Sequence, residues 1–72
     1  MNNPLLNFKE KFISEYEYPE DLVDDLLKYS KKYEGFYDLL AIWNEEKDED
    51  TKYSILIDIL NLYFDILVLE GK

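Results

Sequence analysis

The decisive stretch of this chain is residues 54–69, which read SILIDILNLYFDILVL. Twelve of the fifteen residues from 55 to 69 are apolar. The polar residues are spaced by four, three and four positions, so on an α-helix they share one narrow stripe. These polar residues are Ser54, Asp58, Asn61 and Asp65. The sequence therefore predicts a helix over about 52–69 whose polar stripe is the exposed seam of an otherwise buried element.

A β-strand is the competing interpretation of this stretch, because Ile55, Ile57 and Ile59 alternate with other residues. The spacing of the polar residues does not fit a strand. The run is also too long for one strand, and it contains no glycine or proline that would allow a hairpin. We therefore expect a helix.

Two helices are predicted in the first half of the chain. The first begins with Asn3 as its N-cap and Pro4 at its first helical position. It ends before Pro19, because a proline disfavours helical geometry in the preceding residue. Pro19 opens the second helix, and Gly35 is expected to end it in a left-handed conformation.

A short third helix follows, and its apolar face consists of Phe36, Leu39, Leu40 and Trp43. An acidic loop over residues 45–50 separates it from the last helix. Asp50 or Thr51 is expected to cap that last helix, because both residue types are favoured at helix N-caps.

The fold predicted from these patterns is all-α. We expect a single helical domain over residues 1–72, in the form of a compact small bundle of about four helices with the apolar C-terminal helix at its centre. The residues expected to be buried together are Leu26, Leu40, Trp43, Leu60 and Phe64.

The composition argues against most enzymatic chemistry. The chain has no cysteine and no histidine, which excludes histidine-dependent nucleophilic triads, ordinary zinc sites and helical di-iron sites with a Glu-x-x-His pair. An EF-hand loop starting at Asp48 would need an oxygen ligand and then a glycine where this chain has Lys52 and Tyr53. Two chemical hypotheses remain: a weak cation site in the acidic loop, and catalysis by Asp58 and Asp65 as an acid–base pair. We expect a non-enzyme with no catalytic residues, no cofactor and no metal.

The charge is the strongest indication of a partner. Seventeen acidic residues against eight lysines give a net charge of −9. Such a chain should repel nucleic acids and anionic membranes and attract basic surfaces. We therefore expect a protein partner with a basic surface, no direct nucleic-acid binding and no membrane association. The alternative is that the charge only keeps a small domain soluble.

Acidic side chains interleaved with tyrosines form the candidate partner-binding site. Carboxylates three or four residues apart on a helix lie about 5–6 Å from each other, which is comparable to the spacing of phosphates along a nucleic-acid strand. Tyrosines add contact area at a low cost in conformational entropy. The candidate residues are Glu15, Tyr16, Glu17, Tyr18, Glu20, Asp21, Asp24, Asp25, Glu45, Glu46, Asp48, Glu49 and Asp50.

Three functions fit this surface. In composition the chain resembles the broad class of small acidic phage and mobile-element antagonists of host defence, including anti-CRISPR proteins. That resemblance implies an inhibitor that mimics nucleic acid and covers a basic, nucleic-acid-handling surface. A toxin-neutralising immunity protein or antitoxin would use the same surface. A homo-oligomerising structural or regulatory module would instead form a homodimer through the C-terminal helix. No secretory signal is evident at the N-terminus, so we expect a cytoplasmic protein.

Overall fold

The computed structural model describes residue 5 and residues 7–71, which form four helices and no strand. The helices are α1 (Phe8–Tyr16), α2 (Glu20–Lys32), α3 (Glu34–Glu45) and α4 (Glu49–Leu69). This confirms the predicted all-α bundle of four helices. The expected cap by Asn3 and Pro4 lies outside the described residues.

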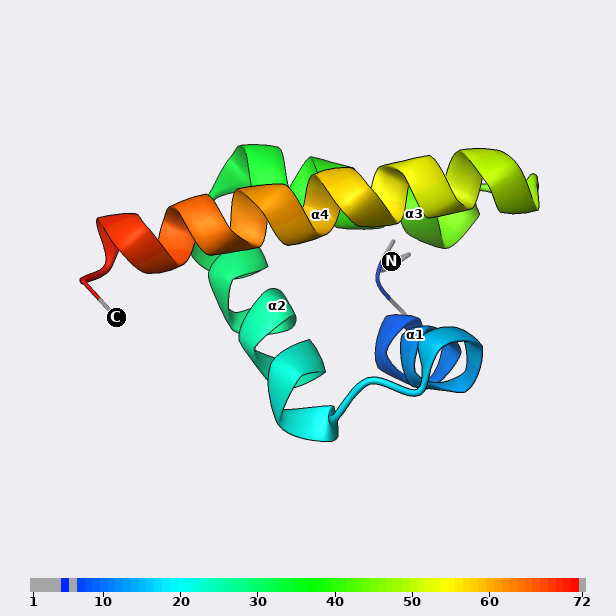
Figure 1. Cartoon of the computed structure of the whole chain (residues 1–72), viewed down its shortest axis with the longest axis horizontal. Coiled ribbons are helices and arrows are strands. Elements are labelled where there is room, and N and C mark those ends of the chain that lie inside the picture. Colours follow the sequence, from blue (N-terminus) through cyan, green and yellow to red (C-terminus); the bar gives the residue numbers. More distant parts are fainter. Residues whose placement is uncertain (1–4, 6, 72) are drawn as a thin grey trace.

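The longest helix, α4, runs along the long axis of the molecule, with α3 behind it and α1 and α2 below it in the view of Figure 1. α3 packs against both α4 and α2, while α1 packs against α2. The C-terminal end of α2 reaches the C-terminal half of α4 (Figure 1). α2 and α3 thus each pack against two neighbouring helices, and part of the circumference of α4 remains exposed.

The corner between α2 and α3 is made by Tyr33 and not by Gly35. Tyr33 has an extended backbone (φ −118°, ψ 108°), and α3 begins at the next residue. Gly35 lies in the first turn of α3, and among the described glycines only Gly71 has a positive φ. The prediction of a left-handed cap at Gly35 is therefore wrong. The hydroxyl of Tyr33 donates a hydrogen bond to Glu70 Oε2 at 2.6 Å, which ties this corner to the end of α4.

The start of α4 is also different from the prediction. Asp48 is its N-cap, because its Oδ2 accepts hydrogen bonds from the backbone N–H of Thr51 at 2.9 Å and from the Thr51 hydroxyl at 2.8 Å. Asp50 lies in the first turn of the helix. The predicted cap at Asp50 or Thr51 is therefore wrong by two or three residues, and the expected acidic loop is reduced to a short turn between Glu45 and Glu49.

The core is built around Trp43 of α3. Leu26, Leu40 and Trp43 are fully buried, as predicted. Leu60 is only partly buried, and Phe64 is 58% exposed, so the expected burial of Phe64 is wrong. The reason is the rotation of α4 about its axis, which directs a different set of residues toward α3. This inner face of α4 consists of Ile55, Leu56, Ile59, Tyr63 and Ile66.

The remaining circumference of α4 divides into two exposed stripes. The polar stripe is exposed at all four of its positions, as the sequence predicts. A second stripe, which we call the outer stripe, is apolar. It consists of Tyr53, Ile57, Phe64 and Val68, with exposures of 59%, 45%, 58% and 79%. None of the helices in the described part of the chain is both long and apolar enough to cross a membrane.

Candidate functional site

The end of α1 and the acidic turn before α4 lie next to each other at one end of the molecule. Lys52 in the first half of α4 joins them, because its Nζ forms an ion pair with Glu15 Oε1 of α1 at 2.8 Å. The side chain of Lys52 is only 12% exposed, and its ammonium lies 4.5 Å from the centre of the Trp43 ring. A cation over an aromatic face is attracted to it. Lys52 therefore holds the end of α1 against the start of α4.

We call this region the acidic end. It consists of Glu15, Glu17, Glu45, Glu46, Asp48, Glu49 and Asp50, which come from the end of α1 and from the turn between α3 and α4. No sequence pattern predicts the contact that creates it, because Glu15 and Lys52 are 37 residues apart.

Tyr16 and Tyr18 are half-buried and support the core rather than project from the surface. Both rings pack on Phe12, with centroid separations of 5.2 and 5.5 Å. The indole N–H of Trp43 donates a hydrogen bond to the Tyr16 hydroxyl at 3.2 Å. Burial raises the pKa of Tyr16, and the negative charges of Glu15 and Glu49 act in the same direction. The structure thus gives the two tyrosines a packing role.

Two acids in the turn before α4 are occupied by local hydrogen bonds. Glu46 Oε1 accepts from the backbone N–H groups of Lys47 and Asp48 at 3.0 and 3.1 Å. Asp48 serves as the cap described above, and the hydrogen bonds from Thr51, first from its backbone and then from its side chain, lower the pKa of Asp48. These bonds give the turn a defined shape and keep Asp48 ionised.

The acids of α2 form a separate group. Lys9 of α1 forms ion pairs with Asp24 and Glu20, both at 2.9 Å, and these contacts raise the pKa of Lys9. Asp25 faces α4, where its Oδ2 accepts a hydrogen bond from the Tyr63 hydroxyl at 3.0 Å. Burial of Tyr63, together with this bond to a carboxylate, raises the pKa of Tyr63 to about 12. The sequence prediction placed the four acids of α2 in the same candidate site as the acidic end. Three of them, Glu20, Asp24 and Asp25, have partners in α1 or α4 instead.

The remaining acids of the predicted site have no ion-pair or hydrogen-bond partner of this kind among residues 5 and 7–71. Each is exposed and forms no ion pair with any residue that the structure describes. They are Glu17, Asp21, Glu45, Glu49 and Asp50. Four of them belong to the acidic end, which is therefore the part of the predicted site with the most uncompensated negative charge.

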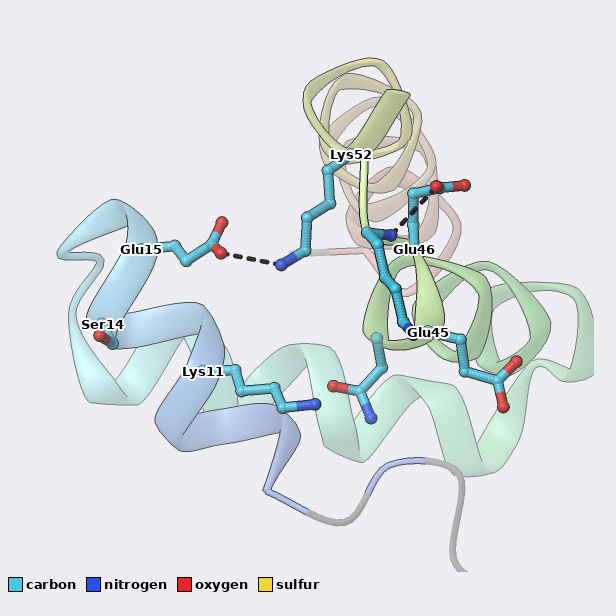
Figure 2. Close-up of a pocket in the computed structure, with 8 residues that line it drawn as sticks. Lys11, Ser14, Glu15, Glu45, Glu46 and Lys52 are labelled. Carbon is cyan, nitrogen blue, oxygen red and sulfur yellow. Dashed lines mark hydrogen bonds and ion pairs between the residues drawn. The ribbon is translucent and has the colours of Figure 1, made fainter. Parts of the chain in front are cut away.

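An open cleft of about 620 Å³ lies between α1 and the turn that precedes α4 (Figure 2). Its lining residues are Lys11, Ser14, Glu15, Asn44, Glu45, Glu46, Lys47 and Lys52. Figure 2 shows the side chains of Lys11 and Lys52 extending into the space between the two segments, whereas the carboxylate of Glu45 points away from it. The sequence prediction did not include these lysines. Positive charge thus lies inside the cleft, and Glu45 is the one acid among its lining residues that is unpaired within the described part of the chain.

Across the described part of the chain, no cluster of three or more carboxylates is placed to hold a metal ion. Comparisons with protein-family models, with curated proteins and with solved structures found no match for this chain.

Proposed function

We propose that this protein is a binding protein whose acidic end covers a basic, nucleic-acid-handling surface of another protein and thereby inhibits it. The observation that supports the proposal is the surplus of unpaired carboxylates at the acidic end. Among these, Glu45, Glu49 and Asp50 lie within six residues of one another around a single turn. Local hydrogen bonds account for Asp48 and Glu46, whereas Glu45, Glu49 and Asp50 form no ion pair with any residue that the structure describes.

The charge suits a partner that ordinarily binds nucleic acid. A protein groove that binds phosphates is lined by lysine and arginine, and binding to it releases counterions. A rigid array of carboxylates can occupy the same groove and compete with nucleic acid. An acidic surface also accelerates association with a basic partner, because the attraction acts before contact.

The acidic end is held in place before any partner arrives. The ion pair between Glu15 and Lys52, the Trp43 ring beneath Lys52 and the cap at Asp48 connect α1, α3 and α4. A surface that is already ordered loses less conformational entropy on binding than a flexible one. The acidic end therefore suits tight binding better than its small size suggests.

The test begins with affinity capture of the partner from the source cells, followed by competition between the chain and nucleic acid for the purified partner. We expect the chain to displace nucleic acid, with an affinity that falls steeply as salt rises from about 50 to about 500 mM, because the Debye length then shortens to a few Å. The double variant Glu45→Gln/Asp50→Asn should weaken binding to the partner by about tenfold or more.

A matched control removes two charges elsewhere. In Glu34→Gln/Asp38→Asn, Glu34 lies in the first turn of α3, as Asp50 lies in the first turn of α4. Asp38 lies further along α3, the helix to which Glu45 also belongs. This variant should bind like the unmodified chain. Equal loss in both variants would show that only net charge matters, and salt-insensitive binding by both would contradict the proposal.

A further inference from the structure

We propose that two copies of this chain associate through the outer stripes of their α4 helices, packed antiparallel about a two-fold axis. The stripe consists of four apolar residues on one face of α4, each more than 40% exposed. Tyr53 and Val68 are fifteen residues apart, so the surface is about 22 Å long. Apolar surface of this extent usually marks an interface. This surface is distinct from the acidic end, and the inference does not depend on the proposed function.

The order of residues in the stripe favours a second copy over an unrelated partner. Tyr53 and Val68 lie equally far from the midpoint between Leu60 and Asn61, and so do Ile57 and Phe64. In a two-fold interface the same patch is used by both copies, so each contact occurs twice. With the axis at this midpoint, Tyr53 of one copy meets Val68 of the other, and Ile57 meets Phe64. The partly buried Leu60 of each copy lies next to the axis.

The charges at the two ends of α4 determine the direction of the pairing. The acidic end surrounds the start of α4. The other end lies beside the lysine-rich end of α2, because Lys32 forms an ion pair with Glu70 at 2.6 Å, and Lys28 and Lys31 belong to the same helical segment. A parallel pair would bring two acidic ends together. An antiparallel pair keeps the two acidic ends apart and places each near the end of α2 in the other copy, where Lys32 is paired with Glu70 and Lys28 and Lys31 are close in sequence.

The aspartates of α4 do not obstruct this pairing. Asp58 and Asp65 belong to the polar stripe, which lies about a quarter of a turn away from the middle of the outer stripe at 3.6 residues per turn. Both are exposed in the single copy and lie at the margin of the contact when the outer stripes meet. The contact therefore buries apolar side chains without burying a carboxylate, which would be costly.

Sedimentation of the 8.7 kDa chain over a concentration series is the first experiment. We expect a species of about twice this mass at micromolar concentrations. Phe64→Lys should raise the dissociation constant on the order of a hundredfold, because both copies lose a buried ring at once. The control is Leu69→Lys, which adds the same charge to α4 at a residue that is 75% exposed but lies outside the stripe. A monomer at all concentrations, or equal loss in the control, would overturn the proposal.

Single cysteine variants test the antiparallel orientation of the two copies even if Phe64→Lys does not fold. The chain has no cysteine of its own, so any disulfide must come from the introduced residue. Leu60→Cys should form a disulfide-linked dimer under mild oxidation, because the two copies of this position meet at the axis. Val68→Cys should not, because its two copies lie about 22 Å apart along the helices, far beyond disulfide reach. Efficient cross-linking of Val68→Cys, or none by Leu60→Cys, would rule out the antiparallel arrangement.

Discussion

The inner face and the outer stripe of α4 have similar residues and opposite environments. The inner face includes Ile59, which is fully buried, and Tyr63, which is 6% exposed. The outer stripe includes Ile57 and Phe64, which are 45% and 58% exposed. Both faces are apolar and belong to one helix, so hydrophobicity alone does not decide which face is buried. The packing of α3 against one side of α4 decides it.

The largest expected effect on stability comes from truncating a side chain of the inner face. Ile59→Ala should lower the free energy of unfolding by about 2–5 kcal/mol, because it leaves a cavity in the core. Phe64→Ala removes a larger side chain but should cost less than about 1 kcal/mol, because the ring is mostly exposed. Leu60→Ala should fall between the two. Urea unfolding at low protein concentration, where self-association contributes least, measures all three, and an equal loss in Ile59→Ala and Phe64→Ala would contradict the difference between the faces.

A smaller effect is expected at the polar contact of the inner face. Tyr63→Phe removes the hydrogen bond to Asp25 and should cost about 1–2 kcal/mol. The pKa of Tyr63 is raised from 10.0 to about 12 in the folded chain. The stability from this hydroxyl is therefore complete below pH 10 and is lost as the pH rises through about 12.

The pH dependence of the Tyr63→Phe variant tests this raised pKa. The difference in unfolding free energy between the unmodified chain and Tyr63→Phe should shrink as the pH rises across that window. Tyr29→Phe is the control, since its ring packs beside Tyr63, with centroids 6.2 Å apart, on the same side of α4. A difference that stays constant with pH would mean that the Tyr63 hydroxyl ionises as readily in the folded chain as in the unfolded chain.

The smallest expected effect concerns the start of α4. Asp48→Ala should lower the melting temperature near neutral pH, because the backbone N–H of Thr51 loses its partner. Asp50→Ala should change it less, because Asp50 does not cap the helix. Since the pKa of Asp48 is lowered in the folded chain, its contribution is present above the ordinary value of 3.8 and disappears as the pH falls through the folded value. Thermal melts of both variants from neutral to acidic pH measure these effects. If Asp50 were the cap, Asp50→Ala would lower the melting temperature more than Asp48→Ala.

The candidate site was only partly predictable from the sequence. The pattern of acids located Glu45, Glu49 and Asp50 on the surface, where the structure has them exposed at the end of α3 and the start of α4. It could not show that Asp25 accepts a hydrogen bond from Tyr63 or that Glu15 pairs with Lys52, because each contact joins residues far apart in the chain. It also assigned Tyr16 and Tyr18 to the binding surface. The structure has both rings half-buried against Phe12, a contact that the acidic pattern around them did not predict.

The sequence by itself determined the local features of this protein. The spacing of polar residues along 54–69, the break at Pro19 and the net charge of −9 depend on neighbouring residues or on composition, and they lead to helices and to an acidic surface. Only the tertiary structure decided which apolar face of α4 lies against α3 and which acids retain their charge uncompensated. The physical reason is that α4 is apolar around most of its circumference over residues 55–69. Several rotations of such a helix satisfy the sequence pattern equally well, and the shape of the neighbouring helices selects one.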